Sequence, residues 1–84
     1  MRHARAEDLE RIAPLLAQLR SLDGLTEKSP GSFYSRSRGF LHFHANGDEM
    51  YADVKLTGDE FERMRVTTKA EQRGLVAAVK RVLQ

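Results

Sequence analysis

Two histidines separated by one residue are the side chains in this sequence best suited to chemistry. On a β-strand, His42 and His44 would point to the same face, about 6.6–7 Å apart along the backbone. With a carboxylate from Asp53 or Glu49 they would form a ligand set for zinc, iron or another first-row metal. A third histidine is not close in sequence, because His3 lies in a terminus that we expect to be frayed. We therefore expect no metal and no cofactor, and interpret the pair as aromatic side chains of a half-buried strand.

Acid–base catalysis is the second chemistry that these residue types allow. In the expected strand register His42 lies beside Tyr51 and His44 lies beside Glu49, and either pair resembles a general base with an orienting partner. Arg63 and Arg65 on the following strand are suited to hold a phosphate. The motifs G-x-S-x-G and G-x-x-x-x-G-K-[ST] are absent, so neither a nucleophile elbow nor a phosphate-binding loop is indicated. We assign no catalytic residue and do not expect an enzyme, while a nuclease-like protein stays open as the alternative.

The histidines belong to a predicted β-hairpin. Apolar and polar residues alternate in segments 40–45 and 50–56, which flank Asn46-Gly47, a dipeptide typical of a two-residue type I′ turn. This turn pairs Ala45 with Asp48 and His42 with Tyr51. The register places one set of apolar side chains on a single face, as a core requires. That set is Leu41, Phe43, Met50, Ala52, Val54 and Leu56.

Weaker strand patterns lie on either side of the hairpin. Segment 61–66 is predicted to follow a three-residue turn at Gly58–Glu60, which sets Val54 opposite Met64 and Asp53 opposite Arg65. Segment 33–37 is a weak candidate for a further strand. The preceding segment 25–32 is rich in Thr, Ser, Pro and Gly and is predicted to be a loop.

A helix is predicted at each end of the chain. The first has Asp8 as its N-cap and is kinked at Pro14, or begins there. The last begins at the capping box formed by Thr68 and Glu71. Its apolar stripe comprises Leu75, Val76, Val79, Val82 and Leu83. The predicted fold is an α+β two-layer sandwich of α-β-β-β-α order, with both helices on one face of an antiparallel sheet.

With both helices on one face, nothing in the chain covers the opposite face of the sheet. In the expected register that face carries Phe40, His42, His44, Glu49, Tyr51, Asp53, Lys55, Arg63 and Arg65, and Phe61 adds another ring at the end of its strand. Lys28, Arg36 and Arg38 would extend this patch. An exposed patch of rings surrounded by charge marks an interface. Two such faces packed across a two-fold axis would bury the rings and pair Asp53 with Arg63 or Arg65.

Length and composition limit the class of protein. The 84 residues fit one domain, residues 1–84, because domains of about 60 residues already fold alone. The absence of cysteine excludes a disulfide scaffold and a thiolate metal site. No apolar run approaches the ~20 residues of a membrane span, so we expect a cytoplasmic protein without a membrane partner. The net charge of +2 is small, and residues 48–68 carry six acidic and three basic side chains, which disfavours a polyanion on these strands.

One stretch resembles a known family. It comprises Leu19–Glu27, with the sequence LRSLDGLTE, followed by Gly31-Ser32-Phe33 and by Gly39–His44. This pattern is similar to the core of the MmcQ/YjbR-like proteins, a group of small bacterial α/β proteins. Asp23 stands where that family usually has proline, and the family's tryptophan-containing C-terminal region is missing. The resemblance implies a fold and a suggested DNA-binding role, and it supplies no catalytic residue.

These observations lead to one expected function and one alternative. We expect a small cytoplasmic, non-enzymatic interaction domain that acts through the open sheet face, by homodimerisation or by docking a protein partner. The alternative is a nucleic-acid-binding or nuclease-like protein that uses His42, His44, Arg63 and Arg65.

Overall fold

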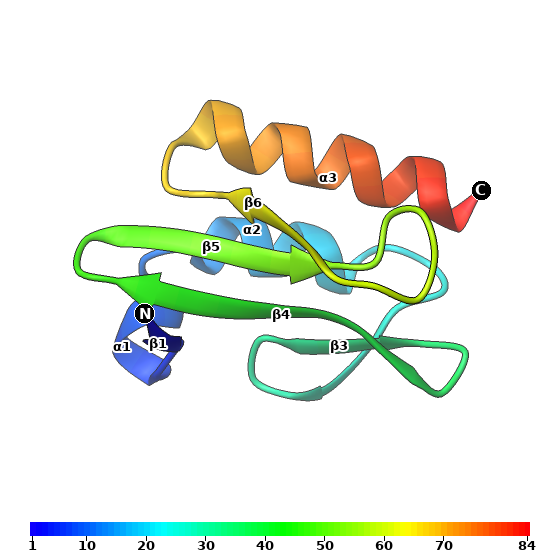
Figure 1. Cartoon of the computed structure of the whole chain (residues 1–84), viewed down its shortest axis with the longest axis horizontal. Helices are drawn as coiled ribbons and strands as arrows, with labels where there is room; N and C mark the ends of the chain where they lie inside the picture. Colours follow the sequence, from blue (N-terminus) through cyan, green and yellow to red (C-terminus); the bar gives the residue numbers. More distant parts are fainter.

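The computed structural model describes residues 1–84 and shows a mixed α+β fold with a six-stranded antiparallel sheet and three helices (Figure 1). The elements in chain order are β1 (Arg2–His3), α1 (Ala6–Glu10), α2 (Ala13–Arg20), β2 (Thr26–Ser29), β3 (Ser32–Ser35), β4 (Arg38–Asn46), β5 (Glu49–Val54), β6 (Glu62–Arg65) and α3 (Lys69–Leu83). The strand order is β2-β3-β4-β5-β6, and β1 pairs with β4. The α+β class and the antiparallel sheet are confirmed, whereas the expected α-β-β-β-α order has three of the six strands. It lacks β1 and β2, and β3 corresponds to the weak candidate at 33–37.

The predicted loop at 25–32 contains a strand and a tight turn. Ser29 pairs with Ser32, so Pro30-Gly31 forms a two-residue turn between β2 and β3, with Gly31 at φ +76°. Proline followed by a residue of positive φ is the signature of a type II turn. The carboxylate of Glu27 accepts a hydrogen bond of 2.9 Å from the Gly31 amide and so holds the turn closed. The loop prediction was wrong because the polar composition of this segment concealed the Pro-Gly turn.

The first helical segment is divided into two helices. α1 begins after Arg5, whose amide donates to the Asp8 carboxylate at 2.9 Å, so Asp8 is the third residue of the helix and not its N-cap. Asp8 is buried and forms ion pairs with Arg2 and Arg11. α2 begins at Ala13 with Pro14 in its first turn, a position where the missing proline N–H costs no helical hydrogen bond. The predicted restart of the helix at Pro14 is confirmed.

The last helix begins as predicted. The Glu71 amide donates to Thr68 Oγ1 at 3.1 Å, and the Thr68 amide donates to Glu71 Oε1 at 2.9 Å, which completes the capping box. Leu75 and Val79 are fully buried, but Val82 of the predicted stripe is 38% exposed. None of the three helices has the length and apolar character needed to cross a bilayer.

The central hairpin forms with the predicted faces but a different register. Asn46 pairs with Glu49, so the turn residues are Gly47 and Asp48 and each strand residue pairs two positions further along than expected. Gly47 has φ +61° and Asp48 does not have a positive φ, which fits a type II′ turn with glycine first. Because the shift is an even number, the same side chains share each face of the hairpin.

The pairing of β5 with β6 also differs from the expected one by two residues. Asp53 lies opposite Arg63 and Val54 opposite Glu62, in place of the expected partners Arg65 and Met64. The connection therefore runs from Lys55 to Phe61 and is longer than the three-residue turn predicted. The even shift again preserves which residues share a face.

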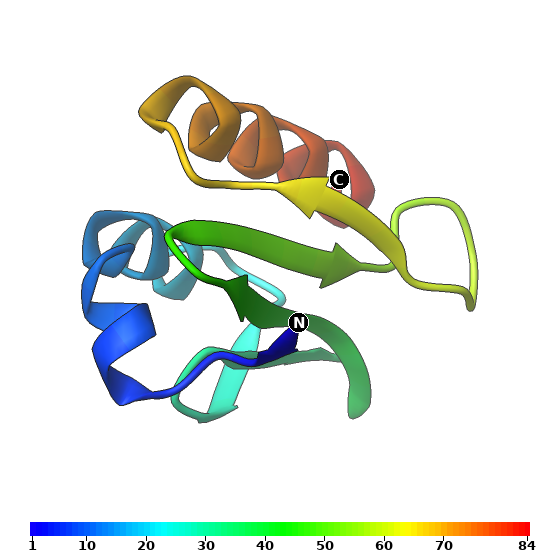
Figure 2. The same cartoon turned by 60° about the vertical axis from the view of Figure 1, so that its left-hand side comes forward.

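The hydrophobic core joins α2 and α3 to alternate residues of β4 and β5. Figure 1 shows α2 passing behind β5, and Figure 2 shows α3 along β6 with α2 beside β5. The fully buried members of the core include Ile12, Leu15, Leu19, Phe33, Leu41, Met50, Ala52, Val54, Val66, Leu75 and Val79. The residues between the buried ones on β4 and β5 are thereby directed away from this core.

Candidate functional site

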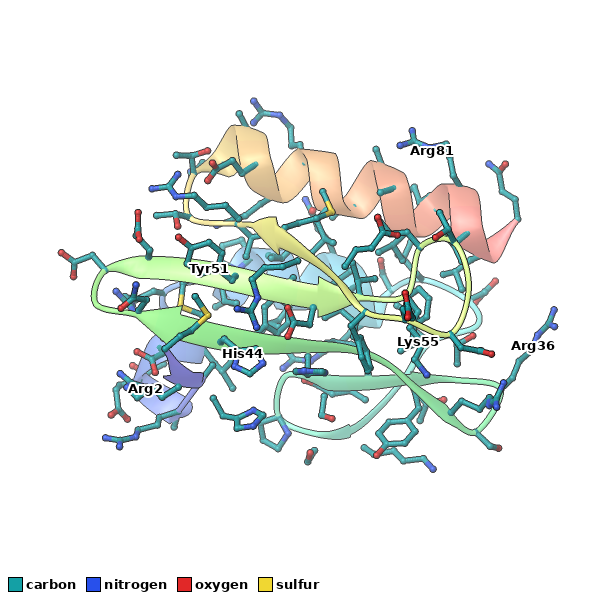
Figure 3. The ribbon with its side chains drawn as sticks, viewed as in Figure 1. Arg2, Arg36, His44, Tyr51, Lys55 and Arg81 are labelled. Carbon is teal, nitrogen blue, oxygen red and sulfur yellow. The ribbon has the colours of Figure 1, made fainter.

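The predicted site residues form two transverse rows across β4, β5 and β6. We call this surface the histidine face. Its first row is His42, Asp53 and Arg63, and its second row is His44, Tyr51 and Arg65. Figure 3 shows His44 on β4 and Tyr51 on the neighbouring β5. Cross-strand neighbours of this kind lie about 4.5–5.5 Å apart at Cβ, so the side chains of each row are in contact range.

Asp53 is the centre of the histidine face. Its carboxylate accepts two hydrogen bonds from Arg63, at 2.8 Å from Nε and 2.9 Å from Nη2. The hydrogen bonds from Arg63 lower the pKa of Asp53 and raise that of the guanidinium. Asp53 is 9% exposed, so its charge is held in place and matched within the chain. The partner expected across a dimer axis is therefore already bound within the same chain.

Three imidazoles gather on the histidine face, one more than the sequence predicted. Nε2 of His42 lies 3.4 Å and Nε2 of His44 lies 3.1 Å from Asp53 Oδ2. His3 pairs with His44 through β1, and their ring centroids are 4.5 Å apart. The expectation of a frayed terminus at His3 was wrong, because β1 adds to the free edge of β4 next to the histidines. Burial lowers the pKa of His44, and the nearby Asp53 charge partly opposes this effect.

The second row is held by a chain of polar contacts. The Tyr51 hydroxyl donates to Glu49 at 3.0 Å, and this hydrogen bond raises the pKa of Tyr51. Arg65 Nη1 donates to the Glu71 carboxylate at 2.8 Å, and Arg65 Nε lies 3.5 Å from Glu49. Arg65 is therefore occupied by carboxylates of its own chain. The catalytic alternative was based on pairing His42 with Tyr51 or His44 with Glu49. Both pairs are replaced, because His42 lies opposite Asp53 and His44 lies opposite Tyr51.

Phe61 and Phe40 have opposite environments. Phe61 is 44% exposed, and its ring lies edge-on to His42 at 4.7 Å, with Lys55 Nζ 5.0 Å from its centre. Phe40 was expected on the open face, but it is buried in the hydrophobic core. The register between β3 and β4 shifts at this residue, because Phe33 pairs with Leu41 and the next pair of the ladder skips Phe40. Such a β-bulge redirects the side chain.

The basic residues expected to extend the patch do not join the histidine face. Lys28 lies over the ring of Tyr34 at 4.5 Å, and Arg38 forms an exposed ion pair of 3.5 Å with Asp59. Arg36 occupies the β3–β4 turn at the far end of the molecule from His44 (Figure 3). The arginines of the histidine face are therefore Arg63 and Arg65, and both are bound to carboxylates of the chain.

Comparison of the chain with protein-family models, with curated proteins and with solved structures finds no match. The resemblance to the MmcQ/YjbR-like proteins therefore stays a prediction. What the candidate site can do follows from its own geometry and chemistry.

Proposed function

We propose that this protein is a non-enzymatic interaction domain that self-associates as a homodimer through the histidine face. In this proposal the helices form one layer of a two-layer sandwich and leave the histidine face uncovered. The observation that supports it is Phe61, an aromatic side chain that stays 44% exposed beside His42. Exposed rings bordered by polar groups are typical of protein–protein interfaces.

The internal pairing of charges makes the histidine face suitable for burial by a protein. Arg63 is bound to Asp53, and Arg65 is bound to Glu71. Burying a charge without a partner is costly, whereas paired and hydrogen-bonded charges reduce that cost. The same pairing leaves both arginines less available to phosphate groups, which disfavours the nucleic-acid alternative.

The order of charges along β5 favours a second copy as the partner. On the histidine face Glu49 lies at the start of β5, and Lys55 follows directly after its end. A two-fold axis in the plane of the interface and perpendicular to β5 reverses the strand direction in the second copy. Glu49 of one copy then meets Lys55 of the other, twice in each dimer, because a two-fold interface uses the same patch on both subunits.

Sedimentation equilibrium over a concentration series tests the proposed interface. We expect a monomer–dimer equilibrium that Phe61→Ser weakens at least tenfold. Val82→Ser is the matched control, because Val82 is a similarly exposed apolar side chain on α3 (38%), and we expect it to leave the equilibrium unchanged. A strict monomer at millimolar concentration, or equal loss in both variants, contradicts the proposal.

Charge reversal tests the orientation of the two copies. Glu49→Lys and Lys55→Glu are each expected to weaken the dimer, because each places like charges together. The variant carrying both changes is expected to recover the dimer, since the pair is restored with opposite sign. Failure of the double variant to recover, with the fold intact by circular dichroism, rules out this orientation.

A further inference from the structure

The geometry points to a binding site for a divalent transition-metal cation, with zinc as the best-fitting ion, formed by His42, His44 and the carboxylate of Asp53. One donor atom from each residue can be chosen so that all three lie within 4.8 Å of one another. This inference goes beyond self-association and does not depend on it, because all three donors belong to one chain.

The spacing of the donors is close to that of a coordinated set. The two imidazole nitrogens lie 3.4 and 3.1 Å from Asp53 Oδ2. Bonds of about 2.0–2.2 Å in a tetrahedral zinc site put neighbouring donor atoms about 3.3–3.5 Å apart. The distances from the two imidazole nitrogens to the Asp53 oxygen are therefore already close to those of a tetrahedral zinc site. The third edge, between the imidazole donors, is at most 4.8 Å long.

The backbone and Arg63 position these donors. His42 and Asp53 are directly paired residues of the central strands β4 and β5, and His44 is two residues further along β4. Arg63 fixes the carboxylate through two hydrogen bonds, as partners of metal-binding carboxylates commonly do. The imidazole nitrogens of both histidines approach the same carboxylate oxygen, Oδ2.

The donor chemistry selects the class of cation. Two imidazoles and one carboxylate suit zinc, cobalt(II) and iron(II), whereas magnesium and calcium prefer sets made of oxygen atoms. Three protein ligands leave a fourth position for water or an external ligand. The Arg63 charge next to Asp53 repels a cation, so we expect micromolar rather than nanomolar affinity.

His3 provides an internal control. Its ring lies 4.5 Å from that of His44 and 6.0 Å from that of His42, measured between centroids, but it is not part of the converging donor set. If histidines on this surface bound metal without a defined site, His3 would contribute as much as the other two.

Calorimetric titration of the untagged full chain with zinc, and absorption spectroscopy with cobalt(II), test the site. We expect one ion per chain, a cobalt spectrum typical of four-coordination, and no response to magnesium. His42→Ala, His44→Ala and Asp53→Asn are each expected to weaken binding by about tenfold or more, whereas His3→Ala changes it by less than about threefold. Absence of binding in the micromolar range overturns the inference, as does equal loss in His3→Ala and His42→Ala or full binding by Asp53→Asn.

The same titration separates this inference from the proposed dimer. One zinc ion per chain is expected at protein concentrations below the monomer–dimer transition, where the histidine face is uncovered and no second copy is needed for binding. A monomer that binds zinc supports the metal site and contradicts only the dimer, whereas a dimer without zinc affinity does the reverse.

Discussion

Asp53 and Arg63 stand opposite each other on β5 and β6 and are joined by two parallel hydrogen bonds of 2.8 and 2.9 Å. The same carboxylate lies within 3.4 Å of both His42 and His44. The mostly buried carboxylate of Asp53 therefore contacts three side chains: the guanidinium of Arg63 and the imidazoles of His42 and His44. The arrangement of His42, His44 and Arg63 therefore centres on this single side chain.

Removal of that charge is expected to destabilise the fold. Asp53→Asn keeps the size of the side chain but leaves Arg63 without its counter-charge, and we expect a loss of about 1–3 kcal/mol in the free energy of unfolding. Urea denaturation measures the loss. Asp59→Asn is the matched control, because Asp59 pairs with Arg38 at the surface, and its removal should change stability by less than about 0.5 kcal/mol. Equal effects of the two substitutions would show that Asp53 has no special role.

The turn of the central hairpin is expected to depend on one glycine. Gly47 has φ +61° and open space around it, so Gly47→Ala introduces backbone strain without a steric clash and should cost about 1–2 kcal/mol. Gly58→Ala is the comparison, because Gly58 also has open space and does not have a positive φ. There we expect no loss or a gain of about 0.4–1 kcal/mol. Thermal unfolding of both variants checks this difference, and equal melting temperatures would contradict it.

Acid is expected to remove the stabilising contribution of Glu27. The hydrogen bond from Arg20, together with that from the Gly31 amide, lowers the pKa of Glu27 below its ordinary value of 4.5. A lowered pKa in the folded state means that the contribution is complete above pH 4.5 and is lost as the pH falls through the folded-state pKa.

The difference in stability between the native chain and Glu27→Gln should therefore be constant at neutral pH and shrink below pH 4.5. Melting temperatures recorded down to about pH 3 test this. The exposed Glu60 provides a control for the loss of a surface carboxylate in Glu60→Gln, for which we expect a change of less than about 0.5 kcal/mol at neutral pH. A Glu27→Gln difference that grows on acidification would contradict the assignment.

Binding to nucleic acid is expected to be absent or weak. Because Arg63 and Arg65 are held by Asp53 and Glu71, few cations on the histidine face are free to release counterions from a phosphate backbone. Fluorescence anisotropy with mixed single-stranded RNA and DNA should show no tight, salt-dependent binding. Tight binding that falls steeply with salt and is lost in Arg63→Ala would favour the nucleic-acid alternative over the interaction domain.

The sequence predicted the faces of the sheet better than its register. Side-chain alternation has a period of two, so a hairpin shifted by two positions still buries Phe43 and Ala52 and presents His42 and His44 together. Turn choice decides the register, and Asn46-Gly47 left the position of the two-residue turn ambiguous. Phe40 was misplaced because a β-bulge interrupts the alternation, and the local sequence carries no sign of it.

The third histidine could not be predicted from local patterns. β1 contains only Arg2 and His3, too few residues to show a period. It joins the sheet because Arg2 binds Asp8 and the strand pairs with β4 at His44 and Ala45. Such pairings arise from tertiary structure, and no spacing in the sequence encodes them.

The pairing of β1 with β4 also sets the order in which the histidine face is built during folding. His42, His44 and Asp53 come together when one local hairpin closes, whereas His3 must bridge from residue 3 to residue 44. Closing long chain segments costs more entropy and slows contact formation. We therefore expect His42, His44 and Asp53 to come together while β1 is still detached, with His3 the last histidine to arrive.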